Sequence, residues 1–268
     1  MFLSLAEDGM RMMDKSFYIE RTIDRSKLTL RRVSTGIPKL DELLQGGLPE
    51  RSVTLISGPP GSGKTILCFH FLQEGIKNGE SCLYISVDQN VETTLMFAKA
   101  SGFDFLPAID NGLLKMIYID LERSGAYQQV GDMIVAGGYT RIVLDSLSPF
   151  ADTPIVLGRS VEFEKAPIIE KLSSYPSDSR PVIRYHIRKI FEFLHSVQAT
   201  SLITSELSEG SQGLSRDTIS EFLADGVILM SVDPMMDRRK LTIWKMRGTS
   251  HTLKPQDIVI TERGIEFK

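Results

Sequence analysis

The chain has 268 residues, of which 42% are hydrophobic and 24% charged, as in an ordinary globular protein with one large domain or at most two. A formal net charge of −3 gives no overall basic field, so the composition does not favour binding to nucleic acid or to an anionic membrane. A local basic groove is still compatible with this charge. The first residues lead directly into Glu7 and Asp8, which is too short and too acidic for a signal peptide. No apolar run approaches the roughly 20 residues of a membrane span. We therefore expect a cytoplasmic protein.

Residues 1–30 carry a weak pattern, and two interpretations remain open: a mobile tail, or an arm that packs on a neighbouring subunit. We expect the main domain over residues 31–268. Its first predicted helix begins at Pro38, has leucines at helical spacing and ends at Gly46-Gly47. These glycines then turn the chain into the first strand.

A glycine-rich loop follows the predicted strand over 53–57 and precedes a predicted helix over 66–77. Its residues are Gly58, Pro59, Pro60, Gly61, Ser62, Gly63, Lys64 and Thr65, and Ile66 begins the helix. This is the G-x-x-x-x-G-K-T pattern of a P-loop, which cradles the phosphates of a nucleotide. Gly61 and Gly63 allow the backbone N–H groups to point at a phosphate, and the helix N-terminus adds partial positive charge. We expect Lys64 to bind the β- and γ-phosphates and Thr65 to bind Mg²⁺.

Two carboxylates come at the ends of predicted strands, where α/β sheets place functional groups. The strand over 141–145 ends at Asp145, which we expect to hold Mg²⁺ through water, with Ser146 in support. The strand over 82–87 is followed by Asp88, which could position or deprotonate an attacking water. The alternatives are a capping role for Asp145 and a turn-forming role for Asp88.

The remaining pattern predicts an α/β fold. Further helices are expected over 91–101, 128–136, 183–194 and 218–223, and further strands over 113–119, 199–204, 226–231, 240–247, 257–261 and 265–267. Residues 154–181, rich in Pro, Ser and charge, predict an insertion with at most one helix. Alternation of strands and helices up to about residue 205, followed by a β-rich end, predicts a mostly parallel central sheet flanked by helices, with a C-terminal antiparallel extension. Cys68 and Cys82 are expected to be buried thiols.

Lys245 and Arg247 are two residues apart on a predicted strand, so both side chains should project from one face, with Thr242, Trp244 and Met246 on the other. Two cations side by side suggest an anionic target, and a γ-phosphate on an adjacent subunit would fit. The alternative is a pair of surface charges on an edge strand.

Taken in order, these stretches resemble the KaiC branch of the RecA, RadA and DnaB ATPases over residues 30–268. The resemblance is carried by the segments 34–36 and 46–49, the P-loop, Val87-Asp88-Gln89, Leu144-Asp145-Ser146 and the run from Lys245 to His251. It implies a RecA-like core and a homo-oligomer, expected to be a hexameric ring, with ATP and Mg²⁺ between subunits. It also implies that Lys245 and Arg247 reach the γ-phosphate of the next subunit.

The resemblance implies further roles near the nucleotide. The backbone around Met246 and the side chains of Thr249 and His251 would lie near the base and ribose. Glu206 would lie between the nucleotide and the central loops.

One departure from that family pattern concerns the two adjacent glutamates after the second strand, which are here Asp88 and Gln89. Aspartate is one methylene shorter and glutamine is not a useful base, so we expect slow ATP hydrolysis. Two alternatives remain open. The first is an ATP-gated scaffold that recruits a protein partner with little turnover. The second is a RecA-like DNA-binding ATPase, which the charge does not support: the loop 206–216 lacks aromatic residues, and the stripe Arg180, Arg184 and Arg188 is more typical of a solvated helix face.

Overall fold

The computed structural model describes residues 29–121, 126–152, 180–207, 211 and 213–268. The chain divides into two units, Met1–Leu30 and Arg31–Lys268, and every element below belongs to the second. The predicted N-terminal arm lies outside the described residues except for its last two. The predicted insertion over 154–181 also lies outside them, except that residues 180 and 181 begin a helix.

The described residues form helices and short strands that alternate along most of the chain. The strands are β1 (Arg32–Val33), β2 (Leu48–Pro49), β3 (Val53–Gly58), β4 (Cys82–Ser86), β5 (Leu114–Tyr118), β6 (Arg141–Asp145), β7 (Thr200–Glu206), β8 (Gly226–Asp233), β9 (Arg238–Met246), β10 (Gln256–Thr261) and β11 (Gly264–Phe267). The helices are α2 (Pro38–Leu43), α3 (Lys64–Lys77), α4 (Val91–Ala100), α5 (Leu106–Asp110), α6 (Ala126–Ala136), α7 (Ser148–Asp152), α8 (Arg180–Ser196) and α9 (Ser220–Leu223).

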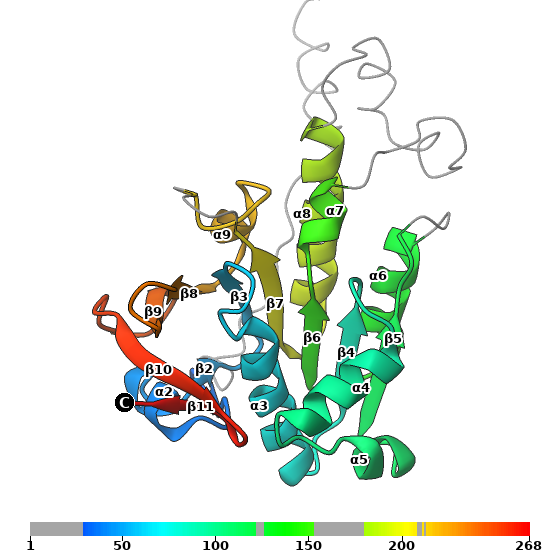
Figure 1. Ribbon diagram of the computed structural model, residues 1–268. Coiled ribbons are helices and arrows are strands. Elements are labelled where there is room, and N and C mark those ends of the chain that lie inside the picture. The colour runs from blue at the N-terminus through cyan, green and yellow to red at the C-terminus, as the bar shows by residue number, and fades with distance from the viewer. Residues whose placement is uncertain (1–28, 122–125, 153–179, 208–210, 212) are drawn as a thin grey trace, which may run out of the picture. The chain divides into compact units, whose positions relative to one another are not determined.

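Nine of these strands form one sheet in the order β11-β10-β9-β8-β3-β7-β6-β4-β5 (Figure 1). The six strands from β8 to β5 pair in parallel, while β9, β10 and β11 add antiparallel neighbours at the β8 edge. The predicted α/β class, with a mostly parallel sheet and a C-terminal antiparallel extension, is therefore confirmed.

Both faces of the inner strands β3, β4, β6 and β7 are buried, because helices cover each of them (Figure 1). Successive residues of one strand alternate between two cores: Tyr84 packs on the side of α3, α4 and α5, and Leu83 and Ile85 pack on the side of α6, α7 and α8. Cys68 and Cys82 are buried free thiols, as expected. Among the described residues, no helix has the length and apolarity needed to cross a membrane.

The sequence pattern missed three features, namely the short helices α5 and α7 and the small sheet β1–β2. It also misplaced one side chain of β9. Trp244 is half exposed while Thr242 and Met246 are buried, because the register between β8 and β9 shifts between Val227 and Ile228. A residue that bulges out of a ladder interrupts the simple alternation of faces.

Candidate functional site

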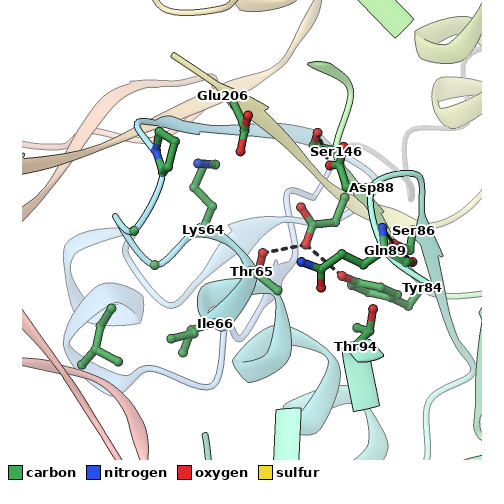
Figure 2. A pocket seen from close by; sticks show the side chains of 15 residues that line it. Lys64, Thr65, Ile66, Tyr84, Ser86, Asp88, Gln89, Thr94, Ser146 and Glu206 are labelled. Atoms are coloured by element: carbon green, nitrogen blue, oxygen red, sulfur yellow. Dashed lines mark hydrogen bonds between the residues drawn. The ribbon is translucent and has the colours of Figure 1, made fainter. Parts of the chain in front are cut away.

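A cavity of about 460 Å³ opens where β4, β6 and β7 end beside the P-loop (Figure 2). Its lining comes from the P-loop, from those strand ends, from Thr94 of α4 and from Ile260 of β10. Binding sites in α/β proteins lie at the carboxyl ends of parallel strands, because loops from several strands meet there. The topology therefore gathers the P-loop and both predicted carboxylates around one space.

The P-loop has the bent backbone that its glycines led us to expect. Gly61 and Gly63 have φ values of 75° and 102°, in the left-handed region that favours glycine. Gly58 allows a close approach, since a Cβ there would lie 2.3 Å from the carbonyl oxygen of Met230. The helix α3 begins directly after Gly63, so its N-terminal N–H groups and the positive end of its dipole face the phosphate position.

Lys64 is 8% exposed, and its ammonium group donates hydrogen bonds to the carbonyl oxygens of Gly58 (2.9 Å) and Pro59 (3.1 Å). Burial lowers the pKa of Lys64, and the nearby carboxylates of Glu206 and Asp145 oppose that change. The cation thus lies over the loop among groups of opposite charge.

Thr65 and Asp145 meet inside the cavity. The Thr65 hydroxyl donates to Oδ2 of Asp145 at 2.7 Å, and the buried Tyr84 hydroxyl donates to the same oxygen at 2.8 Å. Thr204 donates to the other carboxylate oxygen. Hydroxyl and carboxylate oxygens are the ligands that Mg²⁺ prefers, so this donor set fits that ion, with Thr65 and Asp145 as the residues that would hold it.

Asp88 faces the same cavity and accepts a hydrogen bond from the Ser146 hydroxyl at 2.7 Å. Partial burial raises the pKa of Asp88, and the bond from Ser146 acts against that rise. Gln89 and Glu206 also line the cavity, and Figure 2 shows Glu206 and Lys64 on the same side of it. A carboxylate with a raised pKa beside a phosphate-binding loop is a suitable acceptor for a proton from water.

The predicted second set of residues lies elsewhere. As far as the described residues go, the cavity lining includes none of Lys245, Met246, Arg247, Thr249 and His251. Lys245 donates to the carbonyl oxygens of Glu221 (3.0 Å) and Ala224 (2.6 Å), and Arg247 to Asp225 (2.8 Å). Thr249 accepts a hydrogen bond from Arg32 at 2.5 Å.

Four residues that line the cavity were not identified from the sequence: Tyr84, Ser86, Thr94 and Ile260. Tyr84 had a signal that could have been used, because its position in β4 turns it toward α3 and a buried tyrosine hydroxyl needs a partner. Thr94 and Ile260 had none, since only the tertiary fold brings α4 and the antiparallel extension to the P-loop.

Comparisons with known proteins identify the family of the chain. Residues 33–268 match the family model described as "ATPase: KaiC". A UPF0273 protein of Pyrococcus horikoshii is 30% identical over 239 residues, covering 88% of this chain and 93% of that protein, and one of Thermotoga maritima is 30% identical over 240 residues, covering 88% and 95%. The crystal structure of a KaiC-like protein from Pyrococcus horikoshii superposes with a TM-score of 0.70 at 26% identity, covering 90% of this chain and all of that one.

The order of the strands, the P-loop with Lys64 and Thr65, and Asp145 beside it agree with a match that runs from Val33 to the last residue. The chain therefore belongs to the KaiC family of RecA-superfamily ATPases.

Proposed function

We propose that this protein is a slow, Mg²⁺-dependent ATPase of the cytoplasm that works as a ring, with each ATP bound between two subunits. The observation that carries the proposal is the convergence of Lys64, Thr65 and Asp145 in one cavity. A cavity of about 460 Å³ is within the usual range for small-molecule sites.

Each residue of the cavity has a chemical role in this proposal. The P-loop N–H groups and Lys64 bind the phosphates and stabilise the charge that develops during transfer. Thr65 and Asp145 hold the magnesium ion, which supplies charge neutralisation when bound. Asp88 orients the attacking water and takes its proton, and Ser146 holds Asp88 in place. Cleavage then gives ADP and phosphate.

The direction of the strands supports the part of the proposal that places a second subunit at the site. Met246 pairs with Gly226, and Gly226 pairs with Thr54, so the end of β9 lies level with the start of β3. The P-loop follows the other end of β3, a strand of six residues. At about 3.3 Å per residue the two ends are roughly 17 Å apart. Lys245 and Arg247 therefore lie near the end of β3 that is opposite to their own P-loop. This distance supports a role for them at the phosphates of another subunit.

Slow turnover is inferred from Asp88 and Gln89. Aspartate has a shorter reach than the glutamate that the KaiC resemblance implies at this position, and an error of about 1 Å in position can cost roughly a hundredfold in rate. Gln89 has no carboxylate to take over that role.

Steady-state phosphate release with Mg-ATP tests the proposal, with the mass of the same sample measured by light scattering. We expect low turnover and an increase in mass with Mg-ATP, both lost in Lys64→Ala. Asp88→Asn should abolish turnover, Arg247→Ala should reduce it to a small but measurable fraction, and both should leave ATP binding intact. Phosphate release no greater than that of Lys64→Ala would refute the enzymatic activity.

Gln89 favours a second candidate, because it lines the cavity where a catalytic carboxylate would be useful. In that case the protein is an ATP-gated scaffold, which assembles with ATP and binds a protein partner without turnover. Assembly that requires Mg-ATP, without phosphate release, would identify this function.

A further inference from the structure

Asp225 lies at the junction of three elements. Its carboxylate accepts hydrogen bonds from the Val53 N–H (3.0 Å), from Nε2 of His195 (3.1 Å) and from NH1 of Arg247 (2.8 Å). These groups come from the start of β3, from the end of α8 and from the residue after β9. Asp225 carries no recognisable sequence signal, because its three partners are distant from it in the chain.

The backbone of Asp225 is fixed as well. Its N–H donates to the Val53 carbonyl oxygen at 2.8 Å, and its own carbonyl oxygen accepts from the Arg247 N–H at 2.9 Å. Both ends of the Asp225–Arg247 contact are therefore held by β-type main-chain bonds. Partial burial acts to raise the pKa of Asp225, but the bonds from His195, Val53 and Arg247 outweigh it and lower the pKa to about 2. The carboxylate is charged throughout the physiological pH range.

Arg247 keeps access to other ligands. Its side chain is 58% exposed, whereas that of Asp225 is 21% exposed. The contact with Asp225 uses NH1, and a guanidinium group has five N–H donors in a rigid plane. An arginine held through one terminal nitrogen can therefore bind phosphate oxygens with its other donors.

We propose that Asp225 is the positioning residue for Arg247. It holds the Arg247 guanidinium, just after the end of β9, in the orientation that meets the ATP of the adjacent subunit. This inference rests on the proposed function. In this proposal Asp225 acts through Arg247 and makes no contact of its own with the nucleotide or with the attacking water. The opposite possibility is a latch, in which Asp225 withholds Arg247 from the neighbouring phosphate.

The test is a double-mutant cycle on the full chain, with Asp225→Asn, Arg247→Ala and the pair. We expect Asp225→Asn to lower kcat for ATP about tenfold to a hundredfold, with KM changed less than about threefold. In the Arg247→Ala background, Asp225→Asn should have no further effect on kcat, because the arginine that Asp225 positions is absent. Glu192→Gln, which removes an exposed carboxylate paired with Lys189 on α8, is the matched control and should keep full activity.

An increase in kcat with Asp225→Asn would show a latch and overturn the proposal. Losses that add in the double variant would show a structural role and also overturn it. If Asp225→Asn does not fold, Arg247→Lys tests the same geometry, because a lysine keeps the charge but lacks the planar fork; full kcat in that variant refutes positioning. If the wild-type protein turns over ATP faster than Lys64→Ala and Asp225→Asn keeps full activity, only this inference is refuted. If the wild-type protein shows no turnover, the proposed ATPase function is refuted and this inference with it.

Discussion

The Thr65 hydroxyl donates a hydrogen bond to the Asp145 carboxylate at 2.7 Å, although the two residues are 80 positions apart in the chain. Thr65 lies in the first turn of α3, which follows β3, and Asp145 ends β6. The strand β7 lies between β3 and β6, and its Thr204 donates to the same carboxylate. The sheet order therefore aligns three strand ends around one carboxylate.

Asp145→Asn tests this arrangement. The substitution keeps the shape of the side chain and removes its charge. We therefore expect the factor by which Mg²⁺ increases the affinity for ATP to fall about tenfold to a hundredfold. Titration calorimetry with ATP, in Mg²⁺ and in EDTA, measures the effect. Binding in EDTA should change little, and an unaltered difference between the two conditions would argue against metal binding by Asp145.

The pH dependence of turnover follows from Asp88. A base must be deprotonated to act, so kcat should fall as the pH drops through the pKa of Asp88. Burial raises that pKa above its ordinary value of 3.8. The acid limb of the pH–rate profile, where kcat falls at low pH, should therefore lie at higher pH than it would for an exposed aspartate. Ser146→Ala removes a bond that lowers the pKa, so it should move the acid limb further up. A limb that stays in place in Ser146→Ala would mean that another group controls it.

Lengthening Asp88 should speed hydrolysis. If reach limits the rate, Asp88→Glu raises kcat about tenfold or more, with KM for ATP little changed. Gln89→Glu is the matched control, because it adds a carboxylate to the same cavity without changing Asp88. A lower kcat in Asp88→Glu would show that the cavity is shaped for aspartate.

A buried cation outside the site contributes to stability. Arg141 is 1% exposed, pairs with Glu80 through two bonds of 2.9 Å, and donates to the carbonyl oxygens of Ser34 and Phe71. Arg141→Met leaves those acceptors without their donor and should lower the free energy of unfolding by about 3 kcal/mol. Urea denaturation measures it. The exposed Arg263, paired with Glu266, offers a control: Arg263→Met should change stability by less than about 0.5 kcal/mol.

Local patterns were sufficient to predict most strands, the P-loop and the carboxylates Asp88 and Asp145, because each depends on hydrophobic spacing and on a short motif. They were insufficient where a residue depends on the tertiary fold. Ile260 reaches the cavity only because β10 folds back toward α3, where its side chain lies close to Gly63. Asp225 has its role only because β3, α8 and β9 converge on it.

Trp244 offers a direct test of assembly. It is the one tryptophan of the chain, its side chain is 50% exposed, and it precedes Lys245 at the edge that we place between subunits. Burial of this edge on assembly should transfer the indole ring from water into an apolar contact. We therefore expect Mg-ATP to shift its fluorescence emission to shorter wavelength, more strongly at higher protein concentration, and to have no such effect in Lys64→Ala. Assembly seen by light scattering with unchanged emission would place the subunit interface elsewhere, and Lys245 and Arg247 would then lie too far from a neighbouring ATP to act on it.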